Sequence, residues 1–268
     1  MLRPPAPDFL LIGANKAGTT SLIDYLRLHP RIFISRIKEP CFFSDPAQRA
    51  RGEGWYESLF AGARPDQLRG EGSTTYSRWP YLEEPWTLDP REEILARRPD
   101  VRLVYLVRHP VDRAFSHYYN NLRLGRENLS FEDAIDAEEE RIAGEEERLL
   151  SDPQAVSLAH KRYSYLRRGL YAEQLLRWQS CFPEEQLLLV DAGRLFTDPR
   201  AVVAEVLAFV GVDPWEPPNF AARNEGRHGE AMQAATRSRL EVFYEPHEQR
   251  LSDLIGWCPS AGRRRMAA

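Results

Sequence analysis

The chain has 268 residues, of which 43% are hydrophobic and 28% charged, and its formal net charge is −4. A chain of this length buries roughly 70–75% of its unfolded surface, enough for one α/β domain or two small ones. The negative charge excludes a protein whose whole surface binds nucleic acid, but it leaves room for a local anion site.

Apolar runs typical of buried strands alternate along the chain with segments of helical periodicity. The strands are predicted over residues 9–12, 68–71, 102–107 and 186–190. The helices are predicted over residues 19–29, 111–124, 131–150, 170–181, 201–210 and 236–254. This alternation predicts a three-layer α/β fold, in which a mostly parallel central sheet has helices on both faces. We find no internal repeat and no linker, so residues 1–268 are predicted to form a single domain.

The segment from Gly13 to Thr20 carries the strongest chemical signal. Gly13 and Gly18 lie five positions apart, which lets backbone amides turn toward an anion. The N-terminus of the following helix adds its dipole, and Thr19 and Thr20 add hydroxyl donors. The P-loop of nucleotide triphosphatases has its lysine directly after the second glycine, whereas Lys16 lies inside this loop. The segment predicts an anion site distinct from that of a P-loop kinase, and a plain strand-to-helix turn is the alternative.

A second anion site is predicted where the strand over residues 102–107 ends. Arg108 follows at the carboxyl end, where ligands collect in open α/β sheets, and Ser116 lies eight residues further on in the next helix. Arginine binds phosphate in a bidentate manner, and it would repel Mg²⁺ at a place where a P-loop enzyme has an aspartate. The two segments therefore predict a site for anions without a metal.

Together, the two motifs resemble those of sulfotransferases that use 3'-phosphoadenosine 5'-phosphosulfate (PAPS), whose fold is related to that of the P-loop NTPases. The resemblance is to the glycosaminoglycan-type enzymes and their bacterial small-molecule relatives, and it spans about residues 8–256. It implies that Lys16 bridges the 5'-phosphate and the sulfuryl group, and that Arg108 and Ser116 bind the 3'-phosphate. The residues it implies in cofactor binding are Asn15, Lys16, Ala17, Gly18, Thr19, Thr20, Arg108, Ser116 and Arg227.

Glu39 is the candidate general base. A hydroxyl acceptor must lose its proton as it attacks sulfur, so a base is needed near the sulfuryl group. Glu39 is followed by a proline and two aromatic residues, and partial burial among them would raise its basicity. It matches the glutamate proposed as the base in the glycosaminoglycan-type family; an ordinary solvated glutamate is the alternative.

The histidines are the other candidate bases. His109 and His117 flank the motif for the 3'-phosphate, which is the wrong end of the cofactor, and His228 lies in the late loop with Arg227.

Two positions depart from the family pattern. Cys41 stands where a histidine is common and Gly72 where a lysine is common, which leaves open both a different acceptor and a protein that binds the nucleotide without chemistry.

The sequence therefore predicts a PAPS-dependent sulfotransferase that acts on a carbohydrate or another small molecule by in-line transfer, with Lys16 and Glu39 as catalytic residues. We expect no metal, nucleic acid or membrane partner, and the oligomeric state stays open. Residues 1–8 contain no signal-peptide core, and the three cysteines lack metal-ligand spacing, so a cytoplasmic location is expected. A P-loop kinase is the rival enzyme class.

Overall fold

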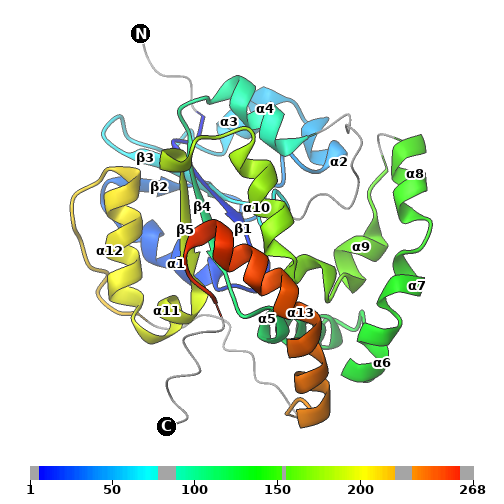
Figure 1. Ribbon diagram of the computed structural model, residues 1–268. Helices are drawn as coiled ribbons and strands as arrows, with labels where there is room; N and C mark the ends of the chain where they lie inside the picture. Colours follow the sequence, from blue (N-terminus) through cyan, green and yellow to red (C-terminus); the bar gives the residue numbers. More distant parts are fainter. Residues whose placement is uncertain (1–5, 78–88, 153–154, 221–230, 260–268) are drawn as a thin grey trace.

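The computed structural model describes residues 6–77, 89–152, 155–220 and 231–259. Its centre is a sheet of five strands in the order β2-β3-β1-β4-β5 (Figure 1). All four neighbouring pairs run parallel. The strands are β1 (Phe9–Gly13), β2 (Ile32–Ile34), β3 (Leu68–Gly72), β4 (Arg102–Val107) and β5 (Leu187–Asp191).

Helices cover both faces of this sheet, which confirms the predicted three-layer α/β fold. On one face lie α1 (Thr19–Arg27), α11 (Ala192–Thr197) and α12 (Pro199–Val210), and on the other α10 (Tyr171–Gln179) and α13 (Ala234–Ile255). The long helix α5 (Pro110–Arg123) follows β4. The shorter helices are α2 (Pro46–Arg49), α3 (Glu53–Ser58), α4 (Pro90–Arg97), α6 (Phe131–Asp136), α7 (Glu138–Ile142), α8 (Glu145–Ser151) and α9 (Leu158–Tyr163), with 3₁₀ turns at Arg167–Gly169 and Glu184–Gln186.

The sheet is buried on both faces, as a parallel sheet between helix layers must be. All five residues of β1 are buried, and so is every residue of β4 except Arg102. Tyr171 and Trp178, on α10, are 2% and 1% exposed. The apolar runs were therefore sufficient to locate the central strands.

The prediction of one continuous helix over residues 131–150 is wrong. This segment forms three short helices, α6 to α8, separated at Ala137 and at Gly144. Gly144 adopts a left-handed φ of 72°, a conformation that ends helices. The carboxylate of Glu138, 4% exposed, accepts hydrogen bonds from the backbone N–H groups of Leu166 and Arg167. This contact between distant segments holds α7 in place and buries one glutamate of the segment.

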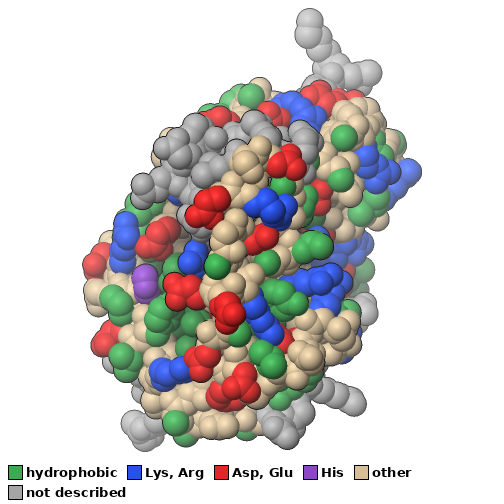
Figure 2. All heavy atoms as spheres, turned by 90° about the vertical axis from the view of Figure 1, so that its right-hand side faces the viewer, with side chains coloured by type: hydrophobic (Ala, Val, Ile, Leu, Met, Phe, Trp, Pro, Cys, Tyr) green, Lys and Arg blue, Asp and Glu red, His purple; other side chains and the backbone are tan. Residues whose placement is uncertain are grey.

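Charges on one face of the molecule are mixed in sign. On the face drawn in Figure 2, basic and acidic side chains are interspersed rather than gathered in one basic patch. Within the described ranges, no helix combines the length and apolarity that crossing a membrane requires.

Candidate active site

The loop after β1 presents backbone groups and one lysine at the N-terminus of α1. Gly18 is the N-cap residue of this helix, with φ 91°, and no side chain caps the helix there, so its first N–H groups can serve a ligand. A Cβ on Gly18 would lie 2.9 Å from a ring carbon of Phe196. Lys16 also has a left-handed backbone, with φ 69°, a conformation that costs free energy for a residue with a side chain.

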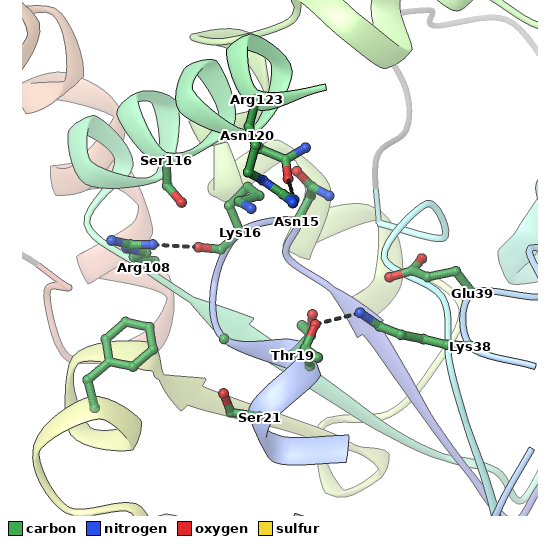
Figure 3. Close-up of a pocket in the computed structure, with 13 residues that line it drawn as sticks. Asn15, Lys16, Thr19, Ser21, Lys38, Glu39, Arg108, Ser116, Asn120 and Arg123 are labelled. Atoms are coloured by element: carbon green, nitrogen blue, oxygen red, sulfur yellow. Dashed lines mark hydrogen bonds between the residues drawn. The ribbon is translucent and has the colours of Figure 1, made fainter. Parts of the chain in front are cut away.

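A cavity of about 320 Å³ opens over this loop (Figure 3). It lies at the edge of the sheet where the parallel strands end, the usual place of ligand sites in open α/β sheets. Segments that follow β1, β2, β4 and β5 all contribute to its wall. The lining residues are Asn15, Lys16, Gly18, Thr19, Thr20, Ser21, Lys38, Glu39, Arg108, Ser116, Asn120, Arg123 and Phe196.

The cavity brings together most of the residues that the sequence singles out, with two exceptions. Ala17 is fully buried and is not among the lining residues. Its side chain packs in the hydrophobic core instead, so the predicted contact of Ala17 with the cofactor would be made by its backbone and stays a prediction. Arg227 lies outside the described residues, as does His228.

Arg108 and Ser116 lie at one end of the cavity (Figure 3). Arg108 comes directly after β4, and its Nη1 donates a hydrogen bond of 2.8 Å to the carbonyl oxygen of Lys16. This bond joins the two anion motifs and orients the guanidinium before a ligand arrives. The guanidinium carbon also lies 5.3 Å from the ring centroid of Phe196.

The cavity concentrates positive charge around Lys16. Burial, followed by the charges of Arg108, Arg123 and Lys38, lowers the pKa of the Lys16 ammonium from 10.5 to about 8. Such mutual repulsion between cations is relieved when an anion binds among them. Electrostatics in this cavity therefore favour a ligand with several negative charges.

Glu39 lies at the other end of the cavity, beside Lys38 (Figure 3). Its carboxylate accepts hydrogen bonds from the backbone N–H of Thr74 at 2.8 Å and from the Thr74 hydroxyl at 3.1 Å. Burial raises the pKa of Glu39, and the Thr74 bonds and the charge of Lys38 offset part of this effect. The half-buried carboxylate is thus held in one orientation and is more basic than a solvated one.

The backbone around Glu39 is also fixed from the neighbouring strand. Glu39 and Cys41 both adopt φ 54°, and such strain persists only where the surroundings impose it. The N–H of Glu39 donates to the Gly72 carbonyl at 3.1 Å, and the N–H of Cys41 donates to the Ser73 hydroxyl at 2.9 Å. Burial raises the pKa of the Cys41 thiol to about 11, so this thiol stays protonated near neutral pH.

The segment that holds Glu39 has its own buried support. Glu71, at 0% exposure, accepts hydrogen bonds from the hydroxyls of Tyr56 and Tyr76 at 2.8 and 2.9 Å. Burial raises the pKa of Glu71 to about 7. Because Glu71 does not line the cavity, we assign it to the support of residues 72–74 and not to the reaction.

Five cavity residues were not predicted from the sequence: Ser21, Lys38, Asn120, Arg123 and Phe196. Ser116, Asn120 and Arg123 follow one another at helical spacing on α5, so periodicity alone could have placed the last two beside Ser116. No comparable signal existed for Phe196, which lies on α11, far away in sequence. His117 is 3% exposed and burial lowers its pKa well below 6.5, so it stays neutral behind the cavity wall.

Comparison with known proteins gives the family. The model of the sulfotransferase domain family matches residues 6–218. The crystal structure of a sulfotransferase from Alicyclobacillus acidocaldarius superposes with a TM-score of 0.76 at 32% identity, over 94% of this chain and 96% of that one. The chain therefore belongs to the sulfotransferase family, and its sequence-based assignment to these PAPS-dependent enzymes is confirmed.

Curated relatives are more distant. Human heparan sulfate glucosamine 3-O-sulfotransferase 6 is 28% identical over 93% of this chain and 72% of its own length. Mouse heparan sulfate glucosamine 3-O-sulfotransferase 5 is 29% identical over 78% of this chain, which spans 54% of that relative. Human bifunctional heparan sulfate N-deacetylase/N-sulfotransferase 2 is 26% identical over 93% of this chain, which spans 29% of that relative. These relatives share the domain and not their whole length.

Proposed function

We propose that this protein transfers a sulfuryl group from PAPS to a hydroxyl or amine of a carbohydrate or another small-molecule acceptor. The observation that carries the proposal is the order of groups along one cavity. Arg108 and Ser116 lie at one end, Glu39 lies at the other, and Lys16 lies between them with the N-terminus of α1. This order corresponds to a 3'-phosphate, a 5'-phosphosulfate and an acceptor placed in sequence.

The residues present fit such a ligand. The cavity is lined by four cationic side chains and a single carboxylate, and PAPS carries negative charge at both ends. The buried Asn15 Oδ1 has no hydrogen-bond partner among the described residues, so this acceptor is open to a hydrogen-bond donor of a ligand. The cationic residues are Lys16, Lys38, Arg108 and Arg123.

Each residue then has a role that follows from its place. The first-turn N–H groups of α1 and the hydroxyls of Thr19 and Thr20 would hold the 5'-phosphate. Lys16 would neutralise charge on the bridging and leaving oxygens, where an ammonium is a compact point charge. When bound, PAPS supplies the sulfuryl group and a leaving group, the 3',5'-bisphosphate PAP.

Glu39 would accept the proton of the acceptor. Its raised pKa improves it as a base near neutral pH, and the Thr74 hydrogen bonds aim its carboxylate. Such a positioned base contributes about 10²–10⁴-fold to rate. Since the relatives named above carry heparan sulfate in their names, a heparan-type oligosaccharide is the first acceptor to test.

Ligand binding tests the proposal even while the acceptor is unidentified. Thermal unfolding would be followed with PAP in EDTA, beside Mg-ATP, for the wild type and for Lys16→Ala. We expect PAP without metal to raise Tm of the wild type and to raise it much less in the variant. Stabilisation by Mg-ATP alone would refute the proposal in favour of a P-loop kinase. Binding of PAP with no transfer from PAPS to any heparan-type, phenolic or amine acceptor would indicate a nucleotide-binding protein.

A further inference from the structure

Lysine is rare in this chain, and two of its lysines meet in the cavity. Only three of the 36 basic residues are lysines: Lys16, Lys38 and Lys161. Lys16 and Lys38 come from different loops and both line the cavity, whereas Lys161 is exposed on α9. An ammonium is a compact charge that reaches a small tetrahedral group more closely than a planar guanidinium does. Two lysines in one anion cavity, in a chain that otherwise uses arginine, therefore point to a shared chemical requirement.

Lys38 reaches the cavity from the loop that follows β2. Its Nζ donates a hydrogen bond of 2.5 Å to Oγ1 of Thr20, in the first turn of α1. The side chain is exposed, and within the described part of the chain no ion pair of Lys38 is found. A neutral hydroxyl thus orients an ammonium that forms no ion pair among the described residues, at the helix N-terminus where the 5'-phosphosulfate is expected.

The neighbours of Lys38 define which part of the ligand it can reach. Lys38 precedes the base Glu39 in sequence, and Figure 3 shows its ammonium extending into the cavity between Glu39 and the loop of Lys16. The charge of Lys38 acts on both of these groups. Arg108 and Ser116 lie at the opposite end. The ammonium therefore lies on the acceptor side of the sulfuryl group and away from the nucleoside.

We propose that Lys38 is a further catalytic residue, which binds an oxygen of the sulfuryl group during transfer while Lys16 neutralises the leaving phosphate. This inference rests on the proposed function. As the acceptor oxygen bonds to sulfur, the bond between sulfur and the phosphate oxygen breaks, and the acceptor proton passes to Glu39. The electron pair of the broken bond stays on PAP. An ammonium that moves from Thr20 to a sulfuryl oxygen stabilises this charge redistribution through a charge-assisted hydrogen bond.

The test uses the difference of one chemical group between two ligands, because PAP is PAPS without the sulfuryl group. Lys38→Ala and the control Lys161→Ala would be compared with wild type in three measurements. These are the affinity for PAP and the affinity for PAPS by calorimetry, and the single-turnover transfer of the sulfuryl group to water as release of radiolabelled sulfate. Water replaces the acceptor, so its identity is not needed.

We expect Lys38→Ala to bind PAP within about twofold of wild type, to bind PAPS several-fold more weakly, and to release sulfate about 100-fold more slowly, the loss typical of one transition-state donor. Lys161→Ala should match wild type in all three. Both variants should keep the wild-type Tm, because both side chains are exposed.

Two results would overturn the inference: sulfate release by Lys38→Ala within threefold of wild type, or an equal loss of affinity for PAP and PAPS, which would place Lys38 on the nucleotide phosphates. Failure of the proposed function is separate, since the wild type itself would then either fail to bind PAP or bind it and transfer no sulfuryl group from PAPS.

Discussion

Replacing Arg108 by alanine tests which end of the cavity binds the 3'-phosphate. The guanidinium is held in place by its hydrogen bond to the Lys16 carbonyl, so its remaining N–H groups are directed before a ligand binds. If it makes two charge-assisted hydrogen bonds to a 3'-phosphate, Arg108→Ala removes both. A ligand without that phosphate loses only the indirect support that Arg108 gives to the Lys16 loop.

The expected size of the effect follows from these contacts. Each hydrogen bond to a charged group contributes about 1.5–3 kcal/mol. Because Arg108 is only half-buried, solvent weakens its hydrogen bonds, and each should contribute a free energy near the lower end of this range. Two such bonds are then worth roughly 3–4 kcal/mol, or about 10²–10³-fold in Kd. The bond to the neutral Lys16 carbonyl contributes about 1 kcal/mol. Its loss should raise the Kd of every nucleotide by about fivefold.

Isothermal titration calorimetry without metal, with PAP and with adenosine 5'-phosphate, separates the two effects. We expect Arg108→Ala to lower the affinity for PAP by about 10²–10³-fold and the affinity for adenosine 5'-phosphate by about fivefold. Arg126→Ala is the matched control, because Arg126 is an exposed arginine just beyond α5. An equal loss of affinity for both nucleotides in Arg108→Ala would refute the reasoning, since the arginine would then act only through the Lys16 loop.

Four further predictions concern the same cavity. Glu39→Gln should leave PAP affinity within about twofold and lower the transfer rate about 10²–10⁴-fold; loss of PAP binding in calorimetry would show a structural role instead. The base acts when ionised and burial raises its pKa, so the rate should fall as pH falls through that pKa. Thr74→Val removes a donor to the ionised carboxylate, so the acid limb of the pH–rate profile should move to higher pH and return in Thr74→Ser; an unmoved limb contradicts this. Gly18→Ala forces a side chain to φ 91° and toward Phe196, which should cost about 1–3 kcal/mol in denaturant unfolding; unchanged stability would contradict the strain. Because the pKa of Lys16 is about 8, PAP affinity should decline as pH rises above that value, and a flat calorimetric profile to pH 10 would exclude a role for its charge.

Local sequence was sufficient for the parts of the site that lie next to each other in the chain. The run before Gly13 and the run before Arg108 are both buried strands, and a helix follows each of them. Such units can be predicted from the sequence because strand burial and helical periodicity are properties of short segments. The prediction of one helix over residues 131–150 was wrong because this segment depends on a distant contact, in which Glu138 accepts a hydrogen bond from backbone about 28 residues further on. The single-domain boundaries and the cytoplasmic location stay predictions.

The residues that carry the chemistry of the anion loop could be identified from the sequence, because Lys16, Gly18 and Thr20 occupy one strand–loop–helix unit. The surroundings of that loop depend on the fold as a whole. The parallel order β2-β3-β1-β4-β5 brings the carboxyl ends of all five strands to one edge, and there Glu39 meets Thr74, and Lys38 meets Thr20. These contacts join segments 18 to 35 residues apart, and they depend on strand order, which no periodicity within a single segment encodes.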